Sequence, residues 1–349
     1  MPASPTPRTG CQRAGRPRAI KRLAITLGTL AERGNLALAT FKAAQGKRQR
    51  PAVAAWLADA DTRLAGLAQR ILAGTAPLGT VQQFEIHDPK RRLITAACFE
   101  DRVLHHAILN LAEPRFEQAL TQVAYACRPG RGVHAAVAAV QRGLQQQPWV
   151  VQVDVDGYFP SIDHAVLRAQ LARRFEGADF LALLGRIIDA GAVATGRGLP
   201  IGALTSQHFA NAYLGSADRL LLAHPGVHGA VRYMDDMVWF CASRAAAQDS
   251  LAALREHLHT ALHLRLKAGV VLRPSGMGLR FCGFRIRPGV VLPGPRKLLR
   301  HRAAVQRLQA AALAACPDAL LQRAHDAHRS ALLPAQSLLF RQRLWWPGL

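Results

Sequence analysis

Hydrophobic residues recur at helical spacing over much of the chain. Between residues 23 and 72 this pattern predicts helices, as in WLADADTRLAGLAQRIL. FEDRVLHHAILNLAEPRFEQAL predicts another helix, which we expect to break or kink at Pro114 because proline lacks the backbone N–H. SQHFANAYLGSADRLLLAH and AAAQDSLAALREHLHTALHLRL each predict one helix. From Arg296 onward the pattern is helical and basic, with interruptions at Pro317 and Pro334.

Other stretches predict strands. PLGTVQQFEIHDPKRRLITAA reads as two strands joined by a turn at Asp88-Pro89. WVVQVDVDGYFPSIDHAVLRAQL predicts a buried strand, a turn, and a helix capped by Ser161 or Asp163. VRYMDDMVWF predicts a hairpin, and LRFCGFRIRPGVVL predicts two short strands around a Pro-Gly turn. Helices mixed with hairpins indicate an α+β fold.

The charge of the chain points to a polyanionic partner. Its 349 residues are 50% hydrophobic and carry 45 Lys and Arg against 22 Asp and Glu, a net charge of +23. Such an excess favours nucleic acid, with a membrane surface as the weaker alternative. We find no apolar run of about 18 residues and no secretory segment, so no membrane association is expected.

Residues 1–22 predict a flexible basic arm, rich in Pro, Gly and Arg. The absence of acids would also suit a mitochondrial presequence, but the prolines oppose an amphipathic helix. The six scattered cysteines include no CxxC pair, so neither a zinc site nor a disulfide framework is indicated. This pattern fits a reducing cytoplasm.

The doublet Asp235-Asp236 in VRYMDDMVWF admits two interpretations. Asp favours turns, so the pair could simply form the tip of the hairpin. Alternatively, the two carboxylates could be hard oxygen ligands for Mg²⁺. Alternation places Asp154 and Asp156 on one face of the preceding buried strand. If that strand lies beside the hairpin, three carboxylates converge, and two Mg²⁺ ions about 3.5–4 Å apart would neutralise them.

Seven motifs in order resemble the palm of a reverse transcriptase, from about Phe84 to Ile286. The first two are KRRLITAACFEDRVLHHAILN and YACRPGRGVHAAV, and the next two are VDVDGYFPSIDH and GLPIGALTSQHFANAYL. YMDD, the helix ending LRLKAG, and FCGFRI complete the series. A lone YMDD is a weak signal, whereas seven motifs in order are a strong one.

The resemblance implies an RNA-directed DNA polymerase with a right-hand fold. We expect an arm over 1–22, N-terminal helices and fingers over 23–150, an antiparallel palm over 151–290, and a short helical thumb over 291–349. The implied catalytic triad is Asp154, Asp235 and Asp236, which would bind two Mg²⁺ ions together with the backbone carbonyl of Val155. Mn²⁺ could substitute. Phe159 matches the aromatic gate that excludes a 2′-hydroxyl, whereas Asp156 is expected to be a turn residue.

The same resemblance implies a nucleotide site and a primer grip. Arginine suits bidentate phosphate contacts, so the fingers cations would clamp the triphosphate. Arg131 would do the same or contact the template backbone. The residues implied to bind the dNTP are Lys90, Arg92, Arg128, Phe159, Ile201, Gln207 and Lys267, and those of the primer grip are Phe281, Gly283 and Phe284.

The fourth motif indicates the kind of reverse transcriptase. It begins Ile201-Gly202 and ends Ser206-Gln207, where most retroviral and intron-type enzymes carry Gln-Gly and Ser-Pro. This form is similar to the enzymes of diversity-generating retroelements. The similarity implies misincorporation opposite template adenine, a template RNA and RNA–cDNA duplex as partners, and a small basic pentameric accessory protein.

Two alternatives remain beside this interpretation. One is a retron-like, group II intron or phage-defence reverse transcriptase. The other is a basic RNA-binding scaffold with a vestigial active site. Among the histidines, His105 and His106 are adjacent in a helix and predict structural or RNA-contacting roles. His325 and His328 could share a helix face, with no acidic or Cys partner to argue for zinc.

Overall fold

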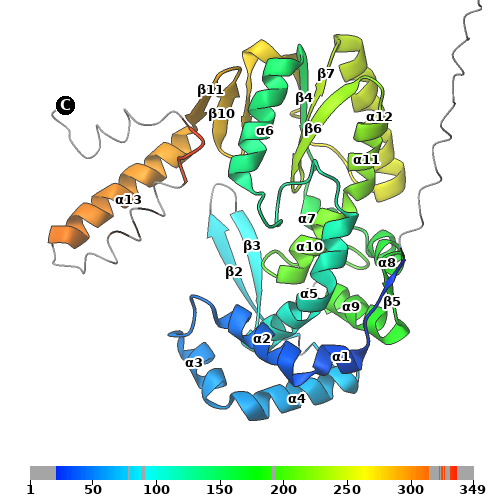
Figure 1. Cartoon of the computed structure of the whole chain (residues 1–349), viewed down its shortest axis with the longest axis vertical. Coiled ribbons are helices and arrows are strands. Elements are labelled where there is room, and N and C mark those ends of the chain that lie inside the picture. Colours follow the sequence, from blue (N-terminus) through cyan, green and yellow to red (C-terminus); the bar gives the residue numbers. More distant parts are fainter. Residues whose placement is uncertain are drawn as a thin grey trace, which may run out of the picture.

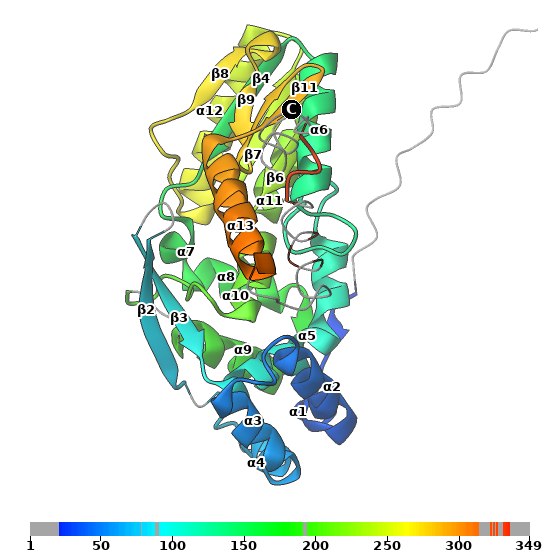
Figure 2. The same cartoon turned by 90° about the vertical axis from the view of Figure 1, so that its left-hand side faces the viewer.

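The computed structural model describes residues 21–77, 79–87, 91–190, 194–313, 322, 324, 326 and 331–335, without the side chains of 92, 93 and 311–313. Helices gather at one end, a four-stranded sheet forms the other end, and a long helix projects to one side (Figures 1 and 2). This is the α+β right-hand arrangement of fingers, palm and thumb that we expected. The exact domain boundaries stay predictions.

Helices dominate the N-terminal part, as the hydrophobic spacing predicts. Burial of Leu64, Leu67 and Ile71 on one face shows why the pattern of WLADADTRLAGLAQRIL forms a helix. A two-residue strand precedes the helices and pairs in parallel with a second one. The elements are β1 (Leu23–Ala24), α1 (Leu27–Ala31), α2 (Arg33–Ala44), α3 (Pro51–Ala58), α4 (Ala60–Leu72) and β5 (Phe175–Glu176).

Helix α5 (Phe99–Ala119) corrects the expectation of a break at Pro114, because it continues past the proline. The turn after the proline is held by packing. The Phe116 ring lies 5.3 Å from that of Phe175 and 5.9 Å from that of Phe209, and it is 2% exposed. Tertiary packing therefore offsets the local cost of the proline.

The fingers ribbon consists of β2 (Val81–His87) and β3 (Arg91–Ala97), which within the described residues pair only with each other. All seven residues of β2 are exposed. The ribbon contacts the body near its base, where the N–H of Thr95 donates to the carbonyl of Ile201 at 2.8 Å. The predicted turn at Asp88-Pro89 lies outside the described residues.

The palm sheet has the order β6-β7-β4-β8, with every pair antiparallel. Its strands are β4 (Trp149–Asp154), β6 (Val227–Tyr233), β7 (Asp236–Cys241) and β8 (Val271–Pro274). Helices α11 (Gly215–Ala223) and α12 (Arg244–Leu262) pack on one side, and α6 (Val133–Gln146) packs on the other. At Gly143 a Cβ would lie 2.2 Å from the Phe240 ring, so glycine permits the close approach of α6.

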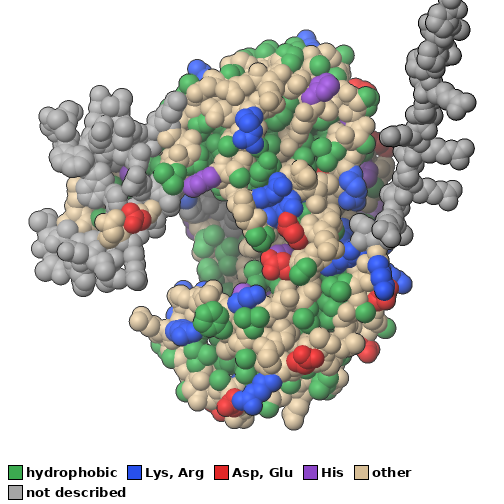
Figure 3. All heavy atoms as spheres, viewed as in Figure 1, with side chains coloured by type: hydrophobic (Ala, Val, Ile, Leu, Met, Phe, Trp, Pro, Cys, Tyr) green, Lys and Arg blue, Asp and Glu red, His purple; other side chains and the backbone are tan. Residues whose placement is uncertain are grey.

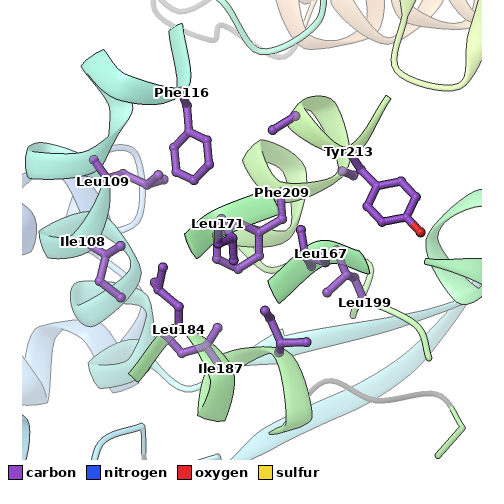
Figure 4. Packing of buried hydrophobic residues seen from close by; sticks show 14 of the residues in the cluster. Ile108, Leu109, Phe116, Leu167, Leu171, Leu184, Ile187, Leu199, Phe209 and Tyr213 are labelled. Carbon is purple, nitrogen blue, oxygen red and sulfur yellow. The ribbon is translucent and has the colours of Figure 1, made fainter. Parts of the chain in front are cut away.

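The central core joins the palm to the fingers helices (Figure 4). Four further helices supply much of it: α7 (Tyr158–Ser161), α8 (His164–Ala172), α9 (Ala178–Ala190) and α10 (Leu204–Tyr213). Asp163 rather than Ser161 caps α8, since its carboxylate accepts from the N–H groups of Ala165 and Val166. The single helix expected over residues 206–224 is two helices, α10 and α11, which meet at Leu214.

A small sheet of order β11-β10-β9 connects the palm to the thumb helix. The expected strands around Pro288-Gly289 are β10 (Phe284–Arg287) and β11 (Val290–Pro293), and a third strand, β9 (Leu279–Phe281), precedes them. A 3₁₀ turn, η1 (Ser275–Met277), links β8 to β9. Helix α13 (Pro295–Leu313) then extends away from the body (Figure 1). Pro334 lies in a turn, whereas Pro317 is outside the described residues.

The surface is rich in Lys and Arg, and in the view of Figure 3 it is hollowed between the fingers below and the palm above. Across the part of the chain that the structure describes, no helix has both the length and the apolar content needed to cross a membrane.

Candidate active site

Three carboxylates meet at one end of the palm sheet. Asp154 is the last residue of β4 and lies directly opposite Asp236, the first residue of β7. Asp235 lies in the two-residue turn between β6 and β7, where Met234 adopts a positive φ of 57°. The convergence expected from alternation and the hairpin is therefore present. Asp156 lies beyond the strand and is exposed, as expected for a turn residue.

Burial and mutual repulsion shift the acidity of this cluster. Burial, followed by the neighbouring charge of Asp154, raises the pKa of Asp235 to about 6. Burial also raises the pKa of Asp236 to about 7, against the hydrogen bond from Gln152 and together with repulsion by the other two carboxylates. The fold thus brings together negative charges that it only partly compensates.

Lys267 provides the positive charge nearest to Asp154. Its ammonium Nζ donates to Asp154 Oδ1 at 2.5 Å, and its backbone N–H donates to the Asp154 carbonyl at 2.9 Å. An antiparallel bridge between Val155 and Leu266 aligns the two segments. The side chain of Val155 is fully buried. The sequence resemblance therefore named a lysine that the fold does bring to the carboxylates.

The donor set fits a divalent cation, although it is not a preformed cage. Within the described residues, no three His, Cys, Asp or Glu side chains are grouped closely enough to hold a metal ion as they stand. Asp154 Oδ1 accepts from Lys267, Asp236 Oδ1 accepts from Gln152 Nε2 at 2.9 Å, and the negative charge of Asp154 acts on Asp235. Neighbouring carboxylates that repel one another are suitable ligands for a hard cation. Asp154 and Asp235 would hold it, with Asp236 less directly placed.

A buried network beneath the hairpin was missed by the sequence analysis. Arg232 on β6 is 1% exposed, and its guanidinium donates to both carboxylate oxygens of Asp218 on α11, at 2.6 and 2.8 Å. It also donates to Asn211 Oδ1 at 2.8 Å and to the carbonyl of Met234 at 3.1 Å. The arginine thereby ties the turn between β6 and β7 to two helices. The signal available in the sequence was an arginine directly after Val231 in a mostly apolar strand.

The implied nucleotide pocket is assembled in part. Phe159 on α7 is half-buried, and its ring lies 5.8 Å from that of Tyr158. Ile201 is half-buried beside β3. At Gly202, which has a φ of +122°, a Cβ would lie 2.9 Å from the Thr95 carbonyl, so glycine allows the fingers ribbon to dock here. Gln207 is exposed on α10, and its amide oxygen accepts from the thiol of Cys127 at 3.6 Å.

Arg128 is not brought into the site as a free cation. Its Nε donates to both carboxylate oxygens of Glu117, at 2.8 and 2.9 Å, and its Nη1 donates to the carbonyls of Thr121 and Ala124. The side chain is 7% exposed. Because its donors are used inside the protein, the expected triphosphate contact is not available in this arrangement.

The structure describes only some of the remaining residues that the sequence analysis singled out. Arg131 lies over the ring of Tyr125 at 5.1 Å. Lys90 and the side chain of Arg92 lie outside the described residues, as do His325 and His328. His105 is buried and its Nδ1 lies 2.9 Å from the hydroxyl of Thr205, which supports the structural role expected for it. Burial, with the charge of His106, lowers the pKa of His105 to about 4.

The implied primer grip forms the turn between β9 and β10. Phe281 and Phe284 are each 1% exposed and point into the core. Gly283 has a φ of +78°, which favours glycine in the turn. Gln152 Nε2 donates to the Arg280 carbonyl at 2.9 Å as well as to Asp236. The turn is therefore linked to the carboxylates through one side chain.

The chain is similar to several known proteins. It is 30% identical over 143 residues to Protein YkfC of Escherichia coli (strain K12), covering 38% of each chain. It is 27% identical over 139 residues to the group II intron-encoded protein LtrA of Lactococcus lactis subsp. cremoris, covering 38% of this chain and 23% of that protein. The chain thus spans well under half the length of these relatives. Among solved structures, telomerase from Candida albicans matches 67% of this chain and 51% of its own, with a TM-score of 0.46 and 10% identity.

The decisive comparison is with a family model rather than with a single relative. Residues 86–268, just over half of the chain, match the model described as reverse transcriptase (RNA-dependent DNA polymerase). This segment includes β4, the β6–β7 hairpin and Lys267, so it contains the whole carboxylate cluster. The chain belongs to the reverse transcriptase family.

Proposed function

We propose that this protein is an RNA-directed DNA polymerase whose catalytic residues are Asp154, Asp235 and Asp236. The observation that carries the proposal is the convergence of these carboxylates at the end of the palm sheet, where Asp154 lies opposite Asp236 and accepts from Lys267. When bound, two Mg²⁺ ions, or Mn²⁺ in their place, would activate the primer 3′-hydroxyl and neutralise the leaving pyrophosphate. Asp154 and Asp235, with the Val155 carbonyl and Asp236, would hold them.

The remaining side chains would position the substrates. Phe159 would close the space beneath the sugar and so favour deoxynucleotides. Lys267 would hold its proton near the leaving pyrophosphate once the carboxylates are otherwise neutralised, which makes it a candidate general acid. Lys90 and Arg92 remain candidates for the triphosphate, and the turn at Gly283 remains the candidate primer grip.

We further propose that the enzyme copies its template with low fidelity opposite adenine, as in diversity-generating retroelements. The support is the fourth motif, in which Ile201 stands where a glutamine would offer a polar contact to the nucleotide. An aliphatic side chain there cannot hydrogen-bond to a misaligned base pair, so the pocket would check its geometry less strictly. The partners would be a template RNA, its cDNA duplex, and a small basic pentameric accessory protein.

Primer extension tests both levels of the proposal. The full chain is given dNTPs, Mg²⁺ and a defined RNA template with a DNA primer, and the cDNA is sequenced. We expect synthesis by the native protein, none by Asp235→Ala, and errors concentrated opposite template adenine that decrease in Ile201→Gln. Even, low errors would reject the diversity-generating subtype. No synthesis, with or without a neighbouring basic protein, would favour an RNA-binding scaffold.

A second candidate is an intron-type reverse transcriptase, because LtrA and a nuclear intron maturase of Arabidopsis thaliana are among the relatives. The same sequencing separates the two. An intron-type enzyme would show no excess of errors at adenine, and its preferred substrate would be a structured intron RNA.

A further inference from the structure

A basic recess lies on the small sheet that connects the palm to the thumb. Its volume is about 400 Å³, and the side chains that line it include four arginines and several apolar residues, but no acid. It extends from β8 across β9 and β10. Figure 1 shows β10 beside β11, where the chain leads into α13. The lining of the recess includes Arg273, Met277, Arg280, Arg285, Arg287 and Leu292.

The strand register places three of the four arginines on one face of this sheet. Arg285 on β10 lies directly opposite Arg280 on β9 and Leu292 on β11. Arg287 follows two residues later and therefore points the same way. The alternate residues Phe284 and Ile286 are 1% and 0% exposed. One face of the sheet is thus core, and the other carries the positive charge.

These charges are not balanced within the protein. Across the described part of the chain, the side chains of Arg273, Arg280, Arg285 and Arg287 form no hydrogen bond or ion pair. Arg273 also has a buried Nε without a partner. Arg280 and Arg285 lie directly opposite each other on neighbouring strands. Like charges in such positions destabilise a sheet. The fold therefore keeps an arrangement that is unfavourable until an anion binds.

Protection of a sheet edge does not explain Arg285 and Arg287. Charged residues often guard edge strands against unwanted pairing. Here β10 is the central strand, paired on both sides, and it carries two of the four. Arg285 and Arg287 therefore serve the face of the sheet rather than its edge.

We propose that this recess binds the backbone of single-stranded RNA. Guanidinium groups suit phosphate oxygens, and Arg285 and Arg287 are about 7 Å apart along the strand, comparable with the spacing of successive phosphates. Met277 and Leu292 are 59% and 41% exposed and offer apolar contact to bases. The recess differs from the implied primer grip, whose phenylalanines face the core. It goes beyond the proposed function, because copying at the carboxylates does not require it.

The test measures binding of a fluorescent 20-nucleotide oligouridylate to the full chain over a series of salt concentrations. The variant is Arg285→Ser/Arg287→Ser. Its control, Arg244→Ser/Arg255→Ser, removes the same charge from exposed positions on α12, across the palm sheet. We expect the recess variant to bind about 10-fold more weakly, and its salt slope to fall by about 1.4, for two lost phosphate contacts. The control should change neither.

Thermal unfolding of both variants checks that the fold is intact. Because Arg285→Ser removes a like-charge pair, the recess variant should unfold at no lower temperature than the native chain. An equal loss of RNA affinity in both variants, or no loss of RNA affinity in either, would overturn the proposal. Binding of polyglutamate is measured in the same way. If the recess variant bound polyglutamate more weakly but RNA as tightly as the native chain, the proposal would be overturned in favour of an acidic protein. Primer extension on the same samples separates this result from the proposed function, since RNA affinity is measured without synthesis.

Discussion

Two clusters of charge lie at the β6–β7 hairpin, one buried and one half-buried, and only the buried one is balanced. Arg232 bonds to both carboxylate oxygens of Asp218, and neither side chain is more than 1% exposed. Asp235 and Asp236 lie a few residues further along the chain, and burial with mutual repulsion raises their pKa values to about 6 and 7. The balanced pair holds the hairpin in place. The unbalanced carboxylates are held where a ligand must complete them, as is typical of functional sites.

Removing a carboxylate from the unbalanced cluster should have the largest effect. Asp235→Asn is nearly isosteric, so we expect cDNA synthesis to fall by about 10³-fold or more, because a charge that the reaction needs is lost. Without metal at pH 8 the variant should be no less stable than the native chain, since a repulsive charge is gone. Primer extension and thermal unfolding give the two readouts. A large loss of stability would show that Asp235 supports the fold instead.

Breaking the balanced pair should have the opposite profile. Asp218→Asn leaves Arg232 buried without its counter-charge, which should cost about 3–5 kcal/mol of unfolding free energy. Asp59→Asn is the matched control, because the Asp59–Arg63 pair is half-exposed and should contribute about 1 kcal/mol or less. Urea unfolding measures both. Equal, small changes would mean that the buried pair is not what holds the hairpin.

Substitution of Lys267 tests whether the cation beside the carboxylates contributes to the rate of synthesis or to the stability of the fold. Its ion pair with Asp154 is partly exposed, so Lys267→Met should change stability by about 1 kcal/mol or less. If the ammonium supplies a proton to the pyrophosphate, the rate should fall by about 10²-fold. Lys267→Arg, which keeps the positive charge, should retain more of the rate than Lys267→Met. A fall in stability with an unchanged rate would assign it a structural role only.

The sequence predicted the unbalanced cluster better than the balanced one. Alternation along WVVQVD and the apolar flanks of YMDD were enough to bring Asp154 to the hairpin, because strand pairing repeats every two residues. Arg232 and Asp218 are joined across a strand and a helix, and no local pattern links them. The motif order identified the family, but it could not show this packing.

Acceptors within the protein also explain why the prediction for Arg128 did not match the structure. The motif suggested a free phosphate ligand, yet Glu117 and two carbonyls use the guanidinium. Similarly, Phe116 keeps α5 intact beyond Pro114, and its packing partners are distant in sequence. Local propensity is a weak guide wherever such contacts decide the outcome.

The smallest expected effect is a pH dependence of stability that only the unbalanced cluster should show. The raised pKa values mean that the folded chain binds protons at Asp235 and Asp236 more tightly than the unfolded chain, whose carboxyls titrate near 3.8. Their contribution to stability is therefore complete below about pH 4, and it is lost as the pH rises through 6 and 7. Metal-free protein should lose melting temperature over this range.

Asp236→Asn isolates this contribution, because the amide oxygen can still accept from Gln152. We expect the fall in melting temperature between pH 5 and pH 8, in the presence of a chelator, to shrink by a few degrees relative to the native chain. Mg²⁺ added at pH 8 should then stabilise the native chain more than the variant, since the cation relieves repulsion that the variant has already lost. Asp218→Asn should leave the pH dependence unchanged, because its partner arginine stays charged throughout. If Asp236→Asn also left it unchanged, the carboxylates would already be balanced without a cation, and the contrast between the two clusters would fail.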